Sequence, residues 1–233
     1  GWDAAHKAMI LASLSYGFWM GACDILVEGI QDVTANDIRF AKQLGYTIKL
    51  LAIIKADEKR EVEVRVHPTL IPSSHVLANV NGVFNAVAVH GDVVGETLFY
   101  GRGAGQDPTA SAVISDLAEA AIALESPRAQ YGFTPHDLYG SCKPIDEIVS
   151  QYYLRLCVID RPGVLAEVAG VLAEFQIGIS SVIQPEAHVD EATALVLMLH
   201  DATHKQMCQA VDRLSQLSCV KKTPRLIRVE TFS

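Results

Sequence analysis

The sequence predicts an α+β protein: a mixed, largely antiparallel sheet with helices on one face, followed by a smaller ferredoxin-like β-α-β-β-α-β unit. Two observations predict this architecture. In the first half, strand patterns are joined by short polar turns suited to hairpins, and no regular alternation of strand and helix is present. In the second half, strand and helix patterns follow one another in the order of the split β-α-β motif.

Length and composition favour two folded domains. The chain has 233 residues, of which 50% are apolar, so it can build real cores and exceeds the usual size of one domain. The net charge of −8 and the scattered basic residues argue against nucleic acid or an anionic membrane as a partner. Neither a membrane-spanning run nor a signal-peptide pattern is recognisable. We therefore expect a cytoplasmic protein.

The residues that commonly bind metals or form disulfides are poorly arranged for either role. The five cysteines are widely spaced and form no C-x-x-C pair, which favours free buried thiols in a reducing compartment. His200 and His204 are four residues apart, but they straddle a predicted strand end and no third ligand follows. We expect both histidines to be solvated and predict no metal site.

The N-terminal stretch predicts the first helix. It is rich in alanine, has no glycine or proline after residue 1, and continues into an apolar run at 8–14. Asp3 and Lys7 are four residues apart and therefore project from one helical face. Such pairs are common surface ion pairs. They can also act on a substrate, where the lysine donates a proton to a developing alkoxide and the aspartate holds the lysine in place.

The following elements of the first half come from local signals. Thr34 or Asn36 is expected to cap a helix that ends near Gly45. The apolar run 46–56 and the alternating run 61–67 predict a hairpin that Pro68 and Pro72 end. The remaining predictions are a short helix at 73–80, a strand pair at 83–90 and 96–100 with its turn at 90–92, and a helix that ends near residue 124.

A glycine-rich segment, residues 101–113, opens this last helix. Glycines permit close approach of the backbone, and a helix N-terminus favours an anion. The spacing is not that of the Rossmann fingerprint, and no β-α-β unit follows. A tight strand-to-helix turn capped by Thr109 or Asp107 is the alternative interpretation.

The second half follows a predicted linker. Residues 126–150 contain three prolines and two glycines and are expected to lack regular structure. The predicted elements after them are strands at 152–159, 179–184 and 193–200, a closing strand formed by Val220 with residues 226–229, and helices at 164–175 and 204–215. The expected domains are therefore 1–125 and 151–233.

Three segments, in order, resemble homoserine dehydrogenases: Gly-x-Asp-x-x-x-Lys at 1–7, the glycine-rich segment at 101–113, and residues 152–184. The resemblance implies an enzyme that interconverts L-aspartate 4-semialdehyde and L-homoserine with NAD(P)H, in the biosynthesis of threonine, methionine and isoleucine. It implies that Lys7 is the catalytic proton donor and that Asp3 and Lys7 bind substrate. It places Gly103, Gly105 and Thr109 beside the nicotinamide.

The resemblance also implies an assembly and a missing part. The sheet layer of the family pairs across a dimer, so we expect a homodimer or homotetramer. Family members carry a nucleotide-binding G-x-G-x-x-G unit before the signature, whereas this chain opens within the signature. We therefore expect a fragment that binds no cofactor and has no activity by itself.

The turn Asp160-Arg161-Pro162-Gly163-Val164-Leu165, with Ile-Gly-Ile at 177–179, resembles the ACT domain, an amino-acid sensor. The resemblance implies an effector held between paired domains, with threonine as the implied ligand. It identifies the effector edge as Asp160, Gly163, Val164 and Ile179. Two alternatives stay open. The Pro-Gly turn can serve only to start a helix, and the whole chain can be a non-catalytic amino-acid sensor whose first half is a dimerisation scaffold.

Overall fold

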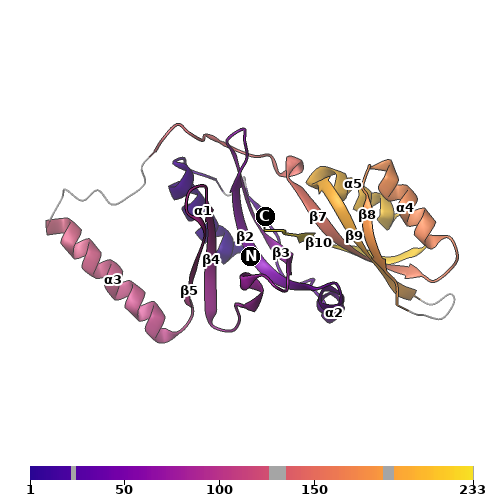
Figure 1. Ribbon diagram of the computed structural model, residues 1–233, viewed down its shortest axis with the longest axis horizontal. Helices are drawn as coiled ribbons and strands as arrows, with labels where there is room; N and C mark the ends of the chain where they lie inside the picture. The colour runs from indigo at the N-terminus through magenta and orange to yellow at the C-terminus, as the bar shows by residue number, and fades with distance from the viewer. Residues whose placement is uncertain (22–24, 126–134, 186–191, 233) are drawn as a thin grey trace. The chain divides into compact units, whose positions relative to one another are not determined.

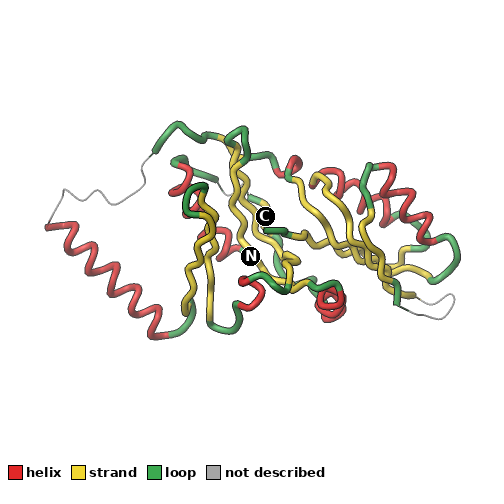
Figure 2. The backbone as a smooth tube through the Cα atoms, in the orientation of Figure 1, coloured by secondary structure: helices red, strands yellow, loops and turns green. Residues whose placement is uncertain are grey.

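The computed structural model describes residues 1–21, 25–125, 135–185 and 192–232 (Figure 1). Figure 2 shows helices and strands in both halves of the chain. The elements, in chain order, are α1 (Trp2–Tyr16), β1 (Leu26–Val27), α2 (Ala35–Gln43), β2 (Tyr46–Ala56), β3 (Glu61–Pro72), η2 (Val76–Asn79), β4 (Phe84–Gly91), β5 (Gly95–Arg102), α3 (Gln106–Glu125), β6 (Ser141–Cys142), η3 (Ile145–Glu147), β7 (Val149–Ile159), α4 (Val164–Glu174), β8 (Ile179–Ile183), β9 (Ala192–Thr203), α5 (His204–Ser215) and β10 (Val220–Val229).

The chain forms two compact units, one of residues 1–72 with 134–233 and the other of residues 73–133. This division differs from the predicted boundaries at 125 and 151. The reason is the last strand: β10 pairs with β3 in parallel, Arg228 opposite Thr69 and Val229 opposite Leu70. A single sheet therefore runs through both halves of the sequence within the first unit.

Strand β3 organises this sheet. One edge of β3 pairs antiparallel with β2 from residue 62 to residue 72. The other edge pairs in turn with β6, β1 and β10, all in parallel. The carbonyls of Val62, Val66 and Leu70 accept hydrogen bonds along this second edge. The even-numbered residues of β3 therefore direct their backbone polar groups toward it.

The prediction that Pro68 ends this strand is wrong, because β3 continues to Pro72. Residue 68 is even-numbered, so its missing N–H group falls on the edge shared by β1 and β10. Along that edge, the pairing of β3 with β1 ends at Val66, and its pairing with β10 begins at Thr69. Proline is tolerated at a strand position where no partner needs its N–H group.

The predicted β-α-β-β-α-β order is present in β7, α4, β8, β9, α5 and β10. The strands lie in the order β10-β7-β9-β8, and neighbouring strands are antiparallel. Helices α4 and α5 lie against one face (Figure 1), where their apolar side chains join Leu154, Leu156, Leu195 and Leu197 in a core. This is the ferredoxin-like arrangement.

Two smaller cores support α1 and α2. Helix α1 packs its alanines against β3, and helix α2 packs Phe40 and Ala41 near Leu70 and Val229. Because side chains alternate along a strand, the polar Glu63, Arg65 and His67 of β3 point away from α1.

The linker prediction is confirmed for residues 135–140, which form no helix or strand, and is wrong for residues 141–150, where β6 and η3 occur and β7 begins. The amide of Lys143 donates to the carbonyl of Val62, and its ammonium lies 3.0 Å from Asp57. These partners lie far away in the sequence, so local composition did not indicate them. Residues 126–134 lie outside the described residues.

The unit of residues 73–133 contains the β4–β5 hairpin and α3. The predicted strand pair is confirmed, but the first strand is shifted by one residue and the second extends at both ends, so the turn lies at 92–94. Phe84 and Tyr100 stack with ring centroids 4.9 Å apart. Helix α3 has no buried residue.

The cysteines are free where the structure describes them. Cys142 and Cys157 are partly buried, Cys219 is buried, and Cys208 is exposed, contrary to the prediction of buried thiols throughout. Cys23 lies outside the described residues. No helix in the described part of the chain is long and apolar enough to cross a membrane.

Candidate functional site

The first turn of α1 carries the candidate site. The carbonyl of Gly1 accepts a hydrogen bond of 2.9 Å from the amide of Ala5, which starts the helix. One helical face buries Ala5, Ala8 and Ala12, and these small side chains let α1 approach β3 closely. Because that face is used for packing, Asp3 and Lys7 project into solvent.

Asp3 and Lys7 form an ion pair. The Lys7 ammonium donates to Oδ2 of Asp3 at 2.7 Å, and the two side chains are 68% and 86% exposed for Lys7 and Asp3 respectively. The hydrogen bond and the charge of Lys7 lower the pKa of the Asp3 carboxyl. The carboxylate is therefore charged at neutral pH. It accepts one hydrogen bond from the ammonium, so the remaining N–H donors of Lys7 are available to a ligand.

The ion pair lies at one end of an exposed apolar stripe. Ile10 and Leu14 follow Lys7 at helical spacing and are 54% and 52% exposed. Trp2, next to Asp3, is also exposed, and its ring centroid lies 6.2 Å from that of His6. A surface pair that serves only solubility is usually surrounded by polar residues, whereas this pair adjoins apolar surface.

Glu28, which sequence reasoning missed, lies beside this helix start. Its amide donates to the carbonyl of Val66 at 2.7 Å, and its carboxylate accepts from Arg228 at 2.8 Å. In the sequence it belongs to a short apolar run. Its partner is 200 residues away, so no local signal identified it.

The glycine-rich segment has local explanations in its own unit. The amide of Gly103 donates to the carbonyl of Val83 at 3.1 Å, and a side chain at 103 would overlap that of Asn85. Gly105 has φ of +127°, which favours glycine. Thr109 lies in the first turn of α3, where its hydroxyl donates to the carbonyl of Gly105, so it does not cap the helix as predicted. Asn85 and the turn explain these residues within this unit, and their place beside the nicotinamide stays a prediction.

The predicted effector edge is only partly assembled within one chain. Gly163 is the N-cap of α4 with φ of +93°, and among the described residues, its two chain neighbours apart, no atom lies within 4 Å of the position of a Cβ there. Asp160 lies nearby in sequence, and its Oδ1 accepts from Gln184 at 3.0 Å. The Val164 side chain is buried in the core, so only its backbone faces this edge.

Ile179 lies at the other end of the sheet. It pairs with Leu199, whereas Ile159, next to Asp160, pairs with Ala192. At about 3.3 Å per residue, this register places Ile179 roughly 20 to 25 Å from Asp160 along the strands. The structure therefore groups Asp160 with Gly163 but does not bring Ile179 to them.

The two histidines that were weighed as metal ligands differ in their surroundings. His200 is exposed, as predicted. His204 is half-buried and its Nδ1 lies 2.9 Å from Nη2 of Arg228, so its prediction as solvated is wrong. Among the residues that the structure describes, no three metal-ligating side chains gather.

The family model described as homoserine dehydrogenase matches residues 1–118. The chain is 44% identical over 231 residues to the homoserine dehydrogenase of Helicobacter pylori and 42% identical over 238 residues to that of Neisseria gonorrhoeae. These matches cover 99% and 100% of this chain and 54% of each relative.

Solved structures agree. The crystal structure of a homoserine dehydrogenase from Thiobacillus denitrificans matches with a TM-score of 0.86 and 38% identity, covering 99% of this chain and 53% of that one. A Staphylococcus aureus homoserine dehydrogenase matches with a TM-score of 0.66 and 31% identity, covering 100% and 54%. The fold is thus that of an oxidoreductase family. The chain belongs to the homoserine dehydrogenase family and spans about half the length of the curated relatives it matches.

Proposed function

We propose that this chain is the substrate-binding and regulatory part of an enzyme that interconverts L-aspartate 4-semialdehyde and L-homoserine with NAD(P). The observation that carries the proposal is the ion pair between Asp3 and Lys7, at the start of the segment that matches the family. The four free thiols fit a reducing compartment, so we place the enzyme in the cytoplasm.

Reduction of the aldehyde needs a hydride at carbon and a proton at oxygen. The nicotinamide cofactor, when bound in the whole enzyme, supplies the hydride. Lys7 is suited to supply the proton, because its ammonium is exposed and retains donors beyond the one held by Asp3. In the reverse direction Lys7 accepts the proton of the homoserine hydroxyl.

Asp3 has two roles in this proposal. One carboxylate oxygen holds the Lys7 ammonium at 2.7 Å and so limits the positions that it can occupy. The other oxygen is available to the ammonium group of the substrate, a charge-assisted contact that would set the orientation of the amino acid. The adjoining exposed Ile10 and Leu14 fit a site that another part of the whole enzyme covers, where a hydride would be protected from water.

The test is steady-state kinetics of the full-length enzyme. Lys7→Met should lower kcat at least about a hundredfold, in the range expected when a general acid is removed, with little change in the KM of homoserine. Asp3→Asn should mainly raise that KM. Lys42→Met is the matched control, because Lys42 is also an exposed helical lysine, on α2. A Lys7→Met enzyme with near-normal turnover would contradict the assignment.

We further propose that β7 to β10, with α4 and α5, form an ACT-type domain that binds threonine. The support is the β-α-β-β-α-β order, the space around Gly163 among the described residues, and the carboxylate of Asp160, three residues earlier in the chain. Backbone groups at Gly163 and Val164 would hold the amino-acid headgroup. Ile179 would join this edge only from a second copy of the chain, which favours a homodimer or homotetramer.

Calorimetric titration of this chain tests the regulatory part. Threonine should bind, while serine and isoleucine, the first lacking the methyl group and the second lacking the hydroxyl, should bind at least tenfold more weakly. Gly163→Val should abolish the heat of binding because its side chain fills the open space. Absence of threonine binding to the unmodified chain would contradict this part and leave the assignment of Lys7 standing.

A further inference from the structure

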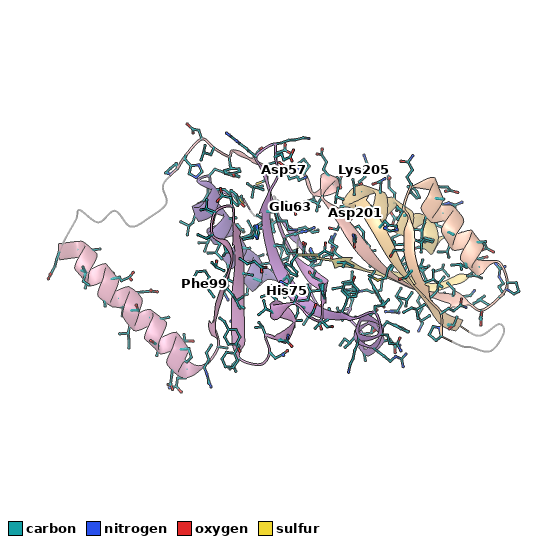
Figure 3. All side chains as sticks on the ribbon, viewed as in Figure 1. Asp57, Glu63, His75, Phe99, Asp201 and Lys205 are labelled. Atoms are coloured by element: carbon teal, nitrogen blue, oxygen red, sulfur yellow. The ribbon has the colours of Figure 1, made fainter. Side chains whose placement is uncertain are left out.

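A buried arginine joins the ferredoxin-like unit to the strand beside α1. Nη1 of Arg228, on β10, donates to Glu28 at 2.8 Å, and Nη2 of the same guanidinium donates to Nδ1 of His204 at 2.9 Å. Glu28 directly follows β1, and His204 is the first residue of α5. His204 lies at the junction of β9 and α5, between Asp201 on β9 and Lys205 on α5, which are labelled in Figure 3.

The guanidinium has these two hydrogen-bond partners and also lies over the Tyr152 ring, 5.9 Å from its centroid. The Arg228 side chain is only 3% exposed, and its Nε has no hydrogen-bond partner among the described residues. Arginine keeps its charge when buried, and its planar fork fixes the direction of each bond. Burial, and then the charge of Arg228, lower the pKa of His204, so its ring is neutral near pH 7 and can accept the hydrogen bond. A shift of the start of α5 would therefore displace Arg228.

Glu28 in turn contacts the start of α1. Its amide is held by Val66 on β3, and its carbonyl oxygen would lie 3.1 Å from a Cβ atom at Gly1. A side chain at residue 1 would crowd this carbonyl and the side chains of Val27 and Val66, so the backbone of Gly1, the N-cap of α1, packs closely on that of Glu28. The first turn of α1 carries Asp3, and Lys7 follows in the next turn.

We propose that Glu28 and Arg228 are positioning residues that couple the start of α5 to the placement of Lys7. A change in the ferredoxin-like unit moves His204, the guanidinium transmits the movement to Glu28, and Glu28 shifts the first turn of α1. The contacts run from the buried guanidinium through the Glu28 side chain to a backbone that β3 holds. The role in turnover rests on the proposed function, since it concerns Lys7. The physical coupling concerns this chain alone.

Amide hydrogen exchange of this chain tests the coupling. His204→Ala should speed exchange of the amides of residues 5–8 in α1 at least tenfold, and should add nothing once Glu28→Gln is present. Lys205→Ala, the next residue of α5, is the matched control and should leave α1 unchanged. His204→Gln serves if the alanine variant does not fold. Unchanged exchange in α1, or effects of His204 and Glu28 that simply add, would overturn the proposal.

The same variants in the full-length enzyme separate the two proposals. If Lys7 is the proton donor, His204→Ala should lower kcat severalfold with an unchanged KM. In an enzyme that already carries Glu28→Gln, His204→Ala should cause no further fall in kcat. Absence of turnover in the unmodified full-length enzyme would refute the proposed function, while hydrogen exchange would still decide the coupling. Normal turnover with no response of kcat to His204→Ala would overturn the role of the coupling in turnover and leave the proposed function standing.

Discussion

Arg155 donates two hydrogen bonds to Asp37, from Nε at 2.6 Å and from Nη2 at 3.1 Å, and so joins strand β7 to helix α2. Asp37 is fully buried and also accepts from the hydroxyl of Tyr153 at 3.1 Å and from the hydroxyl and amide of Thr34. Burial by itself would raise the pKa of Asp37, but the hydrogen bonds from Arg155 and Thr34 lower it. One carboxylate thus caps a helix and links the two halves of the sequence.

Replacement of this carboxylate should destabilise the fold. Asp37→Asn leaves Arg155 largely buried without its counter-ion, and breaking a buried pair costs about 3 kcal/mol or more. Since the Arg155 side chain is 18% exposed and can reach water, we expect about 3 kcal/mol. Chemical denaturation measures this loss. Asp32→Asn, at an 81% exposed aspartate 3.6 Å from Arg225, should change stability by less than about 0.5 kcal/mol. Equal stabilities of the two variants would refute the argument.

Buried His67 should make stability depend on pH. Burial, aided by the charge of Arg228, lowers the pKa of His67 to about 3, below its value of about 6.5 in an unfolded chain. Below pH 6.5 the unfolded chain takes up a proton that the folded protein does not, so stability present above pH 6.5 is lost toward pH 3. At about 1.4 kcal/mol per pH unit, the loss by pH 5 is about 2 kcal/mol.

The measurement is the free energy of unfolding at pH 7 and at pH 5. His67→Gln removes the titrating group, so the variant should lose about 2 kcal/mol less than the unmodified chain between these pH values. The explanation fails if His67→Gln keeps the full pH dependence.

Substitution by alanine should have opposite effects on stability at two glycines, Gly163 before helix α4 and Gly170 within it. Gly163 has φ of +93°, so Gly163→Ala should destabilise the chain by about 1 to 2 kcal/mol through backbone strain. Gly170 lies exposed inside α4 with no positive φ, so Gly170→Ala should stabilise by about 0.5 to 1 kcal/mol. Thermal unfolding of both variants checks the signs. A stabilising Gly163→Ala would show that the left-handed conformation is not required.

Loss of one core leucine should affect both halves of the continuous sheet. Leu197 is fully buried on β9, and Leu197→Ala should cost about 2 to 5 kcal/mol. Because β10 pairs with both β7 and β3, we expect α1 and β3 to unfold together with the ferredoxin-like unit. Hydrogen exchange of the protected amides of β3 should rise as much as that of β7. Leu124→Ala, at an exposed leucine of α3, is the control. Unchanged protection of β3 would show that the halves unfold separately.

Elements with short-range signals were predicted well. The bounds of β2 and α5 are those expected, and Thr34 caps α2, with Asp37 completing a capping box. These signals act within a few residues, where propensity and side-chain-to-backbone bonds decide the conformation. The roles of Asp3, Lys7 and the other candidate site residues stay predictions, since spacing gave their shared helical face but not their chemistry.

The sequence by itself determined the order of elements, the α+β class and the resemblance to homoserine dehydrogenases, because periodicity, caps and short motifs are local. Only the tertiary structure decided that β3 continues through Pro68 and that β6 forms within the expected linker. It also decided that β10 lies between β3 and β7 and so joins both halves of the sequence in one sheet. It further decided the pairing of Glu28 with Arg228 and of Asp37 with Arg155. Buried charges require partners wherever the fold supplies them, and partners more than a hundred residues away leave no pattern in a single sequence.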